Sequence, residues 1–500
     1  MNIDKDSKLI VVHNTRIFVT NYGNLPSSLN TFLTEFNTFY RKGRQVKVPV
    51  WTAIHKTKHP LFGDIICVPR NISIKKLKSF FPDHTLIEDF NCHNPYTTVD
   101  ITCSGNPRDD IQTEALDYLA GDGDYTTRRY FRQKNLFLQT GMGKTFITIK
   151  HIAEVKLMTM IVVHKDSLIG QWTDRITEFT DIKEDEIAVI KGNGSYKKIL
   201  KNKDKYKIII ASNKTINSSL SDDTSITEFR TFVRDMKIGL KVIDEAHLGP
   251  KITFKLDSET NIYNTIYLTA TPKRSKQSSD KIFKMILPDI SNSFGSKQEH
   301  REDAYHNVVY AVISSNPGDE YMSSSVGGIN ISKYSDYIVT NTLSWMYDDI
   351  IKPTIQNNIS HLKDNGFKLA IICGNLNLVT VLYSYIQEDF KDIVSVGNYT
   401  SMVDDKKAQV ISNDVVVSTN CSMDAGDDFS FDIIINLVPL SSEVAIDQLM
   451  GRIRNKPNPL MKKLFIDVSD IGITSNKTQF GVRARYINKA KAVKAQTIRF

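Results

Sequence analysis

The pattern of apolar and polar positions changes along the chain. Residues 1–100 combine short β-rich stretches, at 9–20 and 64–68, with an amphipathic stretch over 72–81. Apolar residues at every second position predict strands, whereas apolar residues three and four apart predict a helix. We therefore predict a small α+β accessory domain over residues 1–100.

A different pattern follows, in which apolar blocks alternate with helical stretches. The blocks of the first series lie at residues 135–138, 160–164, 207–211, 241–244 and 265–270, and those of the second series at 369–373, 393–396, 414–418, 432–437 and 463–468. Strands that are buried on both faces and alternate with helices are typical of parallel sheets with right-handed crossovers. The sequence thus predicts an α/β fold with two tandem parallel-sheet domains, over residues 101–290 and 304–475.

Polar segments separate and follow these two domains. Residues 291–303 are predicted to be an interdomain linker, and the Ser- and Gly-rich residues 314–328 a surface loop. Residues 476–500 are predicted to be a basic C-terminal tail, because the stretch from 482 onward carries six Lys and Arg residues and no acid. Apolar positions at helical spacing within this tail predict the end of a basic helix.

Composition narrows the class of protein. The 500 residues are 41% hydrophobic and 24% charged, with 24 Gly and 15 Pro, which excludes collagen-like repeats and wholesale disorder. The apolar runs are far shorter than the roughly 20 residues of a membrane helix, and the first residues do not resemble a signal peptide, so we expect neither a membrane partner nor secretion. Five cysteines without a CxxC pair fit a reducing compartment. The net charge of +8 is enough to attract a polyanion.

The first segment with recognisable chemistry follows the strand predicted to end at Leu138. It consists of Gln139, Thr140, Gly141, Met142, Gly143, Lys144 and Thr145. A glycine-rich turn before a helix lets backbone N–H groups approach phosphates, the lysine can reach the β- and γ-phosphates, and the hydroxyl can bind Mg²⁺. We therefore predict a P-loop that binds ATP, with Thr145 as a magnesium ligand. A chance Gly-Lys-Thr sequence in a turn is the alternative.

Two carboxylates lie at the end of the strand predicted at 241–244. Asp244 at this position can hold the water shell of Mg²⁺, and Glu245 beside it can polarise the attacking water. Such a pair can also be a helix N-terminus with favourable charges, but the P-loop in the same sheet favours the catalytic interpretation. The strand predicted at 265–270 ends in Thr269 and Thr271, whose hydroxyls are expected to sense His247 and relay the state of the nucleotide.

Together these motifs resemble superfamily 2 helicases with DEAH-box lettering. The P-loop and the letters of residues 244–247 match the first domain of that family, and residues 107–116 are similar to its adenine-contacting segment. The matching residues in the second domain are Gln448, Gly451, Arg452 and Arg454. The resemblance covers about residues 105–470 and implies that both parallel-sheet domains are RecA-like.

The resemblance also implies a role for each matching residue. Adenine is contacted by Gln112, and the rest of the nucleotide by residues 139–145 and Gln448. The catalytic residues are Lys144, Asp244, Glu245, Arg452 and Arg454, and Asp244 joins Thr145 as a magnesium ligand. The family spaces its second arginine three residues after the first, but residue 455 is Asn, so Arg452 is the first choice for the arginine that stabilises charge on the γ-phosphate. Residues 161–172 and 210–212 take the places of nucleic-acid contact motifs.

The N-terminal segment narrows the resemblance further. Residues 64–71, the helix after them and residues 88–89 are similar to the small domain that precedes the core in DNA helicases of the XPB and UvsW type. With the Asn-, Ile- and Lys-rich composition and the length, the chain resembles the poxvirus transcript termination helicases. That resemblance implies a virion-packaged, DNA-dependent ATPase and 3′-to-5′ DNA helicase of the virion core and the infected-cell cytoplasm. It also implies viral RNA polymerase and transcription elongation or termination factors as partners in the release of nascent transcripts.

Basic segments outside the motifs are further candidates for contact with DNA or RNA. Arg41, Lys42, Arg44 and Lys47, with Tyr40 and Trp51 nearby, are suited to track phosphates and stack a base, and are equally suited to a solvated hairpin. The basic tail is a second candidate. Two other functions stay open: a repair or recombination translocase that remodels branched DNA, and a nucleic-acid-binding scaffold for which ATP is only a switch. Glu245 argues against the scaffold, which has no use for a water-polarising carboxylate.

Overall fold

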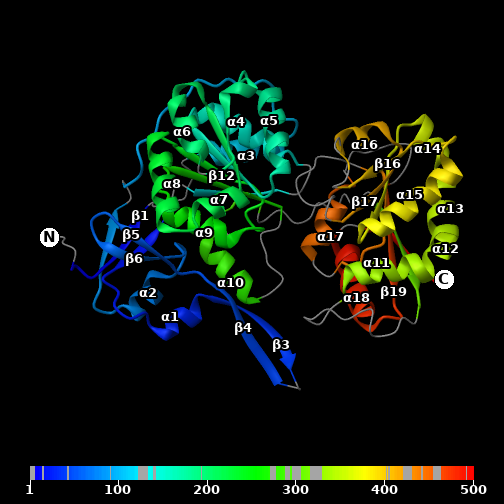
Figure 1. Ribbon diagram of the computed structural model, residues 1–500, viewed down its shortest axis with the longest axis horizontal. Coiled ribbons are helices and arrows are strands. Elements are labelled where there is room, and N and C mark those ends of the chain that lie inside the picture. Colours follow the sequence, from blue (N-terminus) through cyan, green and yellow to red (C-terminus); the bar gives the residue numbers. More distant parts are fainter. Residues whose placement is uncertain are drawn as a thin grey trace. The chain divides into compact units, whose positions relative to one another are not determined.

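Parallel sheets with helices on both faces hold much of the apolar core in a computed structural model of the chain (Figure 1). The structure describes residues 6–13, 16–41, 44–89, 92–121, 133–138, 142–192, 194–270, 277–287, 293–295, 306–315, 329–400, 403, 406–420, 431–440, 443–453, 463–490 and 492–499. The chain divides into two compact units, Met1–Lys297 and Gln298–Phe500. Among the helices of these described ranges, none is long and apolar enough to cross a membrane.

A five-stranded mixed sheet begins the first unit. Its strand order is β5-β6-β2-β1-β7, and β1 and β7 are parallel whereas the other neighbours are antiparallel. Its elements are β1 (Leu9–His13), β2 (Ile17–Thr20), α1 (Ser27–Phe32), β5 (His55–His59), β6 (Gly63–Val68), α2 (Ile74–Phe80) and β7 (Thr85–Asp89). Successive residues of β1 alternate between two cores, with Ile10 and Val12 in one and Leu9 and Val11 in the other, as the pleat of a strand requires. This is the α+β arrangement that the sequence predicts.

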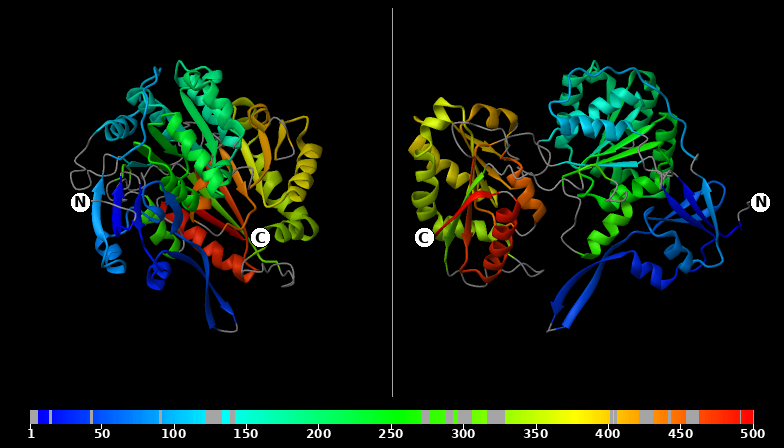
Figure 2. Two further views of the ribbon diagram at one scale, coloured as in Figure 1. Left: turned by 60° about the vertical axis from the view of Figure 1, so that its left-hand side comes forward. Right: turned by 180° about the vertical axis from the view of Figure 1, so that it is seen from behind.

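An antiparallel ribbon projects from the accessory domain (Figures 1 and 2). It pairs β3 (Thr34–Arg41) with β4 (Arg44–Thr52). At its base, Trp51 Nε1 donates a hydrogen bond to Glu35 Oε2 at 2.6 Å, and the indole lies 6.5 Å from the ring of Phe254. Trp51 therefore packs inward, which contradicts the prediction that it is free to stack a base. The side chains of residues 38–45, with most of the predicted basic cluster, lie outside the described residues.

A buried carboxylate joins the accessory domain to the domain that follows it. Glu259, which is 4% exposed, accepts a hydrogen bond from Arg230 Nε at 2.6 Å and is also hydrogen-bonded to His55 of β5. Burial alone would raise the pKa of Glu259, but the contacts with His55 and Arg230 hold it below its usual value. Arg16 adds a hydrogen bond from Nη1 to Ser258 O at 2.9 Å. Because these contacts connect residues some 200 positions apart in sequence, the accessory domain and the first parallel sheet form one unit.

Six parallel strands form the sheet of the first large domain, in the order β10-β11-β9-β12-β13-β8. Its elements are α3 (Asp110–Ala120), β8 (Gln133–Phe137), α4 (Lys144–Val155), β9 (Thr159–Val163), α5 (Ser167–Phe179), β10 (Ile187–Ile190), α6 (Gly194–Lys201), β11 (Ile208–Ser212), α7 (Asn213–Ser219), α8 (Asp223–Asp235), β12 (Leu240–Ile243), α9 (Pro250–Glu259), β13 (Asn264–Thr269) and α10 (Gln277–Ile286). The five apolar blocks predicted as buried strands correspond to β8, β9, β11, β12 and β13. The edge strand β10 is not among the predicted blocks.

Seven parallel strands form the sheet of the second unit, in the order β16-β17-β15-β18-β19-β14-β20. Its strands are β14 (His306–Ile313), β15 (Leu369–Cys373), β16 (Val396–Tyr399), β17 (Val415–Thr419), β18 (Ile433–Asn436), β19 (Lys463–Asp470) and β20 (Ala492–Arg499). Its helices are α11 (Ile331–Tyr337), η5 (Ile338–Thr342), α12 (Leu343–Met346), η6 (Tyr347–Ile351), α13 (Lys352–Gln356), α14 (Ile359–Asp364), α15 (Leu376–Phe390), α16 (Lys406–Ser412), α17 (Glu443–Met450) and α18 (Thr474–Ala490). The predicted fold class, two tandem α/β domains after an α+β domain, is confirmed.

Two predictions about this second unit need correction. The strand predicted at 393–396 begins only at Val396, because Ile393 closes the turn after α15 through an N–H bond to Phe390 O. The basic helix end predicted in the tail is present as α18, but the chain then continues as the strand β20, which pairs in parallel with β14. The described side chains of β20, at 495–499, are mostly exposed, so its sequence lacks the apolar pattern of a buried strand.

The start of the predicted linker is also part of the sheet of the first domain. Phe294 O accepts a hydrogen bond from Phe137 N at 3.0 Å, and Phe294 N donates to Asn135 O at 3.2 Å. Residues 293–295 thereby cover the open edge of β8. The rest of the stretch predicted as linker, residues 291–292 and 296–303, lies outside the described residues.

Arg483 provides a test of the corrected C-terminal region. Its side chain is 1% exposed, and its guanidinium donates to Asp467 Oδ2 at 3.1 Å, Leu440 O at 2.8 Å and Ser469 Oγ at 2.6 Å. Arg483→Ala leaves Asp467 buried without its counter-charge, so we expect the free energy of unfolding of the second unit to fall by about 3–5 kcal/mol. Denaturant unfolding of the full chain measures this. Arg485→Ala, two residues further along and on the exposed side of α18, is the matched control and should change stability by less than about 0.5 kcal/mol. Equal stability of the two variants would contradict the prediction.

Candidate active site

The predicted catalytic segments meet at one edge of the first parallel sheet. β8, β13 and β12 are neighbours, and their pairing sets Phe137 beside Thr269 and Ile243 beside Tyr267. Since all three strands are parallel, their carboxyl ends lie at the same edge. The residues that follow these strands, which include the P-loop, Asp244 and the end of β13, are therefore brought together.

The P-loop ends in a left-handed glycine. Gly143 has φ +84°, a conformation that favours glycine, and Lys144 begins α4 directly after it. Lys144 Nζ donates to Leu138 O at 2.9 Å, which places the ammonium at the mouth of the loop. Thr145 lies half-buried in the first turn of α4, where a hydroxyl can face a phosphate-bound metal. Gln139, Thr140 and Gly141 lie outside the described residues.

Gln112 is bound to the same loop. Its Nε2 donates to Met142 O at 3.1 Å, and its Oε1 accepts from Arg108 N at 3.0 Å. Its own N–H donates to Asp109 Oδ1 at 2.9 Å, which caps α3. The side chain thus links the segment predicted to contact adenine with the P-loop. The adenine contact itself stays a prediction.

Asp244 is a half-buried carboxylate immediately after β12. Its Oδ2 accepts a hydrogen bond from Trp172 Nε1 at 3.0 Å, and its Oδ1 accepts one from Glu245 N at 2.9 Å. Burial and the charge of Glu245 raise the pKa of Asp244 to about 6, although the Trp172 bond and the Lys144 ammonium act in the opposite direction. Two adjacent carboxylates with one ammonium nearby are an oxygen-rich, negatively charged donor set, which fits Mg²⁺. Asp244 and Thr145 are the side chains that would hold that ion.

A chain of polar contacts leads from Glu245 to the end of β13. Glu245 has φ +46°, which is rare for a residue with a side chain and typical of functional sites. Its Oε2 lies 3.2 Å from His247 Nδ1, and His247 Nδ1 lies 2.7 Å from Thr269 Oγ1. His247 is 1% exposed and Thr269 fully buried, so the contact is shielded from water. The predicted contact between Thr269 and His247 is therefore present, whereas Thr271 lies outside the described residues.

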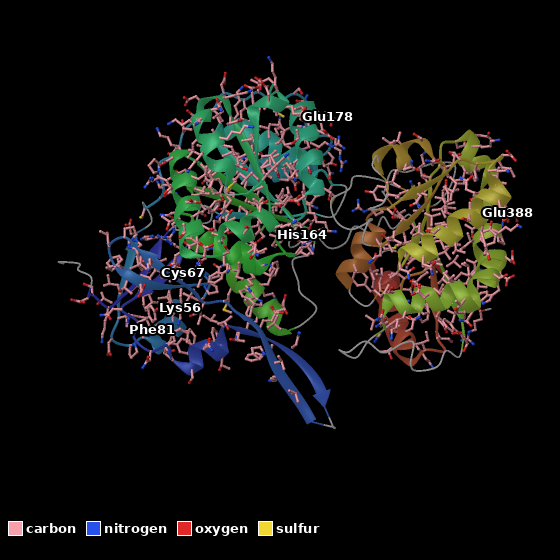
Figure 3. The ribbon with its side chains drawn as sticks, in the orientation of Figure 1. Lys56, Cys67, Phe81, His164, Glu178 and Glu388 are labelled. Atoms are coloured by element: carbon pink, nitrogen blue, oxygen red, sulfur yellow. The ribbon has the colours of Figure 1, made fainter. Side chains whose placement is uncertain are left out.

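The structure assigns one residue a place that the sequence did not predict. Trp172 lies on α5, in a segment matched to a nucleic-acid contact motif. Its indole N–H, however, donates a hydrogen bond to Asp244 and so positions that carboxylate. Only the three-dimensional adjacency of α5 and β12 shows this, because the two residues are 72 positions apart in sequence. In the same motif His164, labelled in Figure 3, follows β9 and lies with Nδ1 3.5 Å from Asn213 Nδ2.

The second unit holds the remaining predicted site residues. Arg452 follows α17 and is 4% exposed; its N–H donates to Leu449 O at 3.1 Å, and its carbonyl accepts from Phe431 N at 2.9 Å. Gln448 lies on α17, but its side chain is outside the described set, as is the whole of Arg454. The nucleotide contacts assigned to these three residues stay predictions.

Comparison with known proteins agrees with this geometry. Residues 108–274 match the family described as type III restriction enzyme, res subunit. A Haloarcula marismortui protein named as the DNA 3′-5′ helicase Rad25 is 26% identical over 155 residues, which are 31% of this chain and 22% of that protein. A protein of Acanthamoeba polyphaga mimivirus named as the ATP-dependent RNA helicase L396 is 23% identical over 363 residues, 71% of this chain and 64% of that protein.

Two further comparisons concern the XPB type and the fold. The XPB helicase/translocase subunit of the general transcription and DNA repair factor IIH of Schizosaccharomyces pombe is 21% identical over 216 residues, 42% of this chain and 25% of that protein. Among solved structures, S. cerevisiae Dbp5 bound to RNA and ADP BeF3 is similar with a TM-score of 0.50 and 12% identity, over 78% of this chain and 89% of that chain. The fold is that of a superfamily 2 helicase core. Both parallel-sheet domains are RecA-like, as predicted.

These comparisons support an ATP-dependent helicase of superfamily 2 and bear out the expected likeness to XPB-type proteins. The chain spans from about a fifth to just under two thirds of the length of these curated relatives, between 22% and 64%. Because the chain covers less than two thirds of each relative, its binding of ATP and of nucleic acid is a proposal, as are the identity of the nucleic acid and the biological role.

Gly143 provides a test of the helicase P-loop. A Cβ at this position would lie 2.2 Å from Gln112 Nε2 and would require a left-handed backbone, so Gly143→Ala must displace the loop or the glutamine. We expect ATP hydrolysis to fall by about 10²-fold, since a displacement of about 1 Å in a phosphate-positioning loop is enough for such a loss. Gly170→Ala, in the interior of α5 with nothing within 4 Å of the added Cβ, is the matched control and should hydrolyse ATP at the parent rate. A fully active Gly143→Ala variant would refute this role of the loop.

Proposed function

We propose that the protein is an ATP-driven DNA helicase and translocase that moves 3′ to 5′ and releases nascent RNA at viral postreplicative transcription termination. The observation that carries the ATP-driven part is the continuous path from Asp244 through Glu245 and His247 to Thr269, beside the P-loop. The choice of DNA and of direction draws support from the relative named as a DNA 3′-5′ helicase and from the XPB subunit. The role in termination rests on the resemblance to the poxvirus helicases.

Each residue at the sheet edge has a task in hydrolysis. Lys144 neutralises the β- and γ-phosphates, and Thr145 and Asp244 hold Mg²⁺. When bound, the ion supplies positive charge to the phosphate oxygens as the γ-phosphate leaves. Glu245 accepts a hydrogen bond from the attacking water and orients it, with its carboxylate held in place by His247. Arg452 is the first candidate, and Arg454 the second, for the arginine that stabilises the transition state.

The contact between His247 and Thr269 couples hydrolysis to motion. When the γ-phosphate leaves, the charge beside Glu245 changes, and Glu245 is 3.2 Å from the imidazole that contacts Thr269 at 2.7 Å. Thr269 is the last residue of β13, so a shift of its hydroxyl is transmitted to the chain that leaves the sheet there. A buried polar chain of this kind has few alternative arrangements, which makes it suited to a two-state relay.

The nucleic-acid contacts are proposed to be mainly electrostatic. Residues 36–63, which include the projecting ribbon beyond Glu35 at its base, carry six Lys and Arg residues and no Asp or Glu. Such a one-sign segment attracts a phosphate backbone without reading sequence, so binding should weaken steeply with salt. Arg483 is excluded from this role because it is buried, while Arg485 remains exposed on α18.

The proposed partners and cellular locations come from the resemblance to the poxvirus helicases. Viral RNA polymerase and transcription elongation or termination factors are the proposed partners, and the virion core and the infected-cell cytoplasm the proposed locations. RNA is the main competing substrate, because the mimivirus relative that aligns with 71% of the chain is named as an RNA helicase. Branched DNA is another, since the XPB relative belongs to a transcription and repair factor.

The test is ATP hydrolysis by the purified chain without nucleic acid and with single-stranded DNA, duplex DNA, forked DNA or RNA. We expect strong stimulation by DNA, no preference for forks and little response to RNA. Lys144→Ala and Glu245→Gln should each lower stimulated turnover by at least about 10²-fold, since each removes a group that acts on the transition state. Glu245→Gln should still bind ATP, which separates loss of chemistry from loss of folding.

Other outcomes would favour a different substrate or a different function. Stimulation by RNA alone would contradict the DNA assignment, and a marked preference for forks would favour a repair translocase. ATP binding by the parent chain without measurable turnover would indicate the scaffold. If DNA stimulates, addition of ATP and the chain to stalled viral polymerase should release RNA, and Glu245→Gln should not; release at equal rates by both would refute the role in termination.

A further inference from the structure

Three side chains with metal-binding atoms meet in the accessory domain, away from the nucleotide site. His13 ends β1, Asp89 ends β7, and these two residues are partners in the parallel pairing of the strands. Cys92 follows three residues after Asp89. One ligand atom from each of the three lies within 4.8 Å of the other two.

The fold of the accessory domain brings these groups together, and the first RecA-like domain contacts one of them. The carboxyl ends of parallel strands meet at one edge of a sheet, which explains the closeness of His13 and Asp89. Cys92 is fixed from the first RecA-like domain, where Asn261 lies just beyond α9: Asn94 N donates to Asn261 O at 2.7 Å, and Asn261 Nδ2 lies 3.6 Å from Cys92 Sγ. The cluster therefore lies where the chain passes from the accessory domain into the motor.

One ring nitrogen of the histidine is suited to bind an ion. His13 is 5% exposed, and its Nδ1 is buried with no hydrogen-bond partner among the described residues. A buried polar atom without a partner costs free energy, so such an atom in a native structure is a candidate for an ion or a water molecule. Neutral imidazole is the form that binds metals.

The donor atoms of the cluster favour Zn²⁺ over other common metal ions. A thiolate and a carboxylate together balance a divalent charge, and a sulfur–nitrogen–oxygen donor set suits Zn²⁺, whereas Mg²⁺ and Ca²⁺ prefer oxygen alone. Zinc bonds of about 2.0–2.3 Å at tetrahedral angles hold their ligand atoms roughly 3.3–3.8 Å apart, so atoms that lie within 4.8 Å of one another would draw together around the ion, and water can complete the tetrahedron. Cys92 is partly exposed and Asp89 exposed, which leaves an entry path for the ion.

We propose that His13, Asp89 and Cys92 form a zinc site that ties the segment after β7, which Asn261 of the first RecA-like domain contacts, to the sheet of the accessory domain. The site is separate from ATP hydrolysis and does not depend on the proposed function. It differs from a zinc ribbon, because its single cysteine is joined by ligands from two strands of a sheet.

The experiment is a titration of the metal-free full chain with Co²⁺, which replaces Zn²⁺ and reports its ligands by absorption. We expect about one equivalent to bind, with visible bands of tetrahedral cobalt and a near-ultraviolet band from the thiolate, both abolished by competing Zn²⁺. Cys92→Ser should remove the thiolate band and weaken Co²⁺ binding by more than about tenfold, because loss of even a residue that only hydrogen-bonds a metal ligand lowers metal affinity by about that factor. Cys103→Ser, at another partly exposed cysteine of the same unit, is the matched control and should change neither the thiolate band nor the affinity for Co²⁺.

Folding is checked separately. Asp89→Asn, at an exposed position, should keep the thiolate band and the circular dichroism of the parent while weakening Co²⁺ binding. Zn²⁺ should raise the melting temperature of the parent and not that of Cys92→Ser. The proposal is overturned if the parent shows no thiolate band, or if Cys92→Ser or Asp89→Asn binds Co²⁺ as tightly as the parent.

Discussion

The half-buried carboxylate of Asp244 is the constraint on which the candidate active site depends. A charge at the end of a central parallel strand is unfavourable unless positive or hydrogen-bonding groups surround it. The chain meets this need with the indole N–H of Trp172, the backbone N–H of Glu245 and the nearby ammonium of Lys144. Since burial and Glu245 still raise the pKa of Asp244 to about 6, the site remains matched to a further cation, and Mg²⁺ carried by ATP fits that need.

The strand that carries Asp244 is itself held by a buried ion pair on one face of the sheet. Lys241 of β12 is fully buried, and its Nζ lies 2.5 Å from Asp257 Oδ1, while Tyr267 OH donates to Asp257 Oδ2 at 2.6 Å. Burial lowers the pKa of Lys241, and the charge of Asp257 opposes that effect. Asp257 lies on α9, two residues before Glu259, which joins the accessory domain. The same helix therefore supports the catalytic strand and anchors the N-terminal domain.

The sequence predicted what depends on local pattern and little of what depends on distant contacts. Buried strands, the P-loop and the contact of His247 with Thr269 follow from apolar blocks and motif spacing, and the structure contains them. Trp172 was matched to a nucleic-acid contact motif and Trp51 was one candidate for stacking a base, yet each donates to a carboxylate fixed by the fold. Arg483 was counted in the basic tail as a candidate for nucleic-acid contact, because its partner Asp467 is brought to it only by the packing of α18 on β19.

The most direct test of the role of Asp244 is the magnesium dependence of nucleotide binding. Binding of a non-hydrolysable ATP analogue is measured by calorimetry with and without Mg²⁺ for the parent chain, Asp244→Asn and Glu245→Gln. If Asp244 holds the ion, Mg²⁺ tightens binding by more than about tenfold in the parent and in Glu245→Gln, and has little effect in Asp244→Asn. The same magnesium dependence in all three proteins would contradict the assignment of Asp244 as the metal-holding carboxylate.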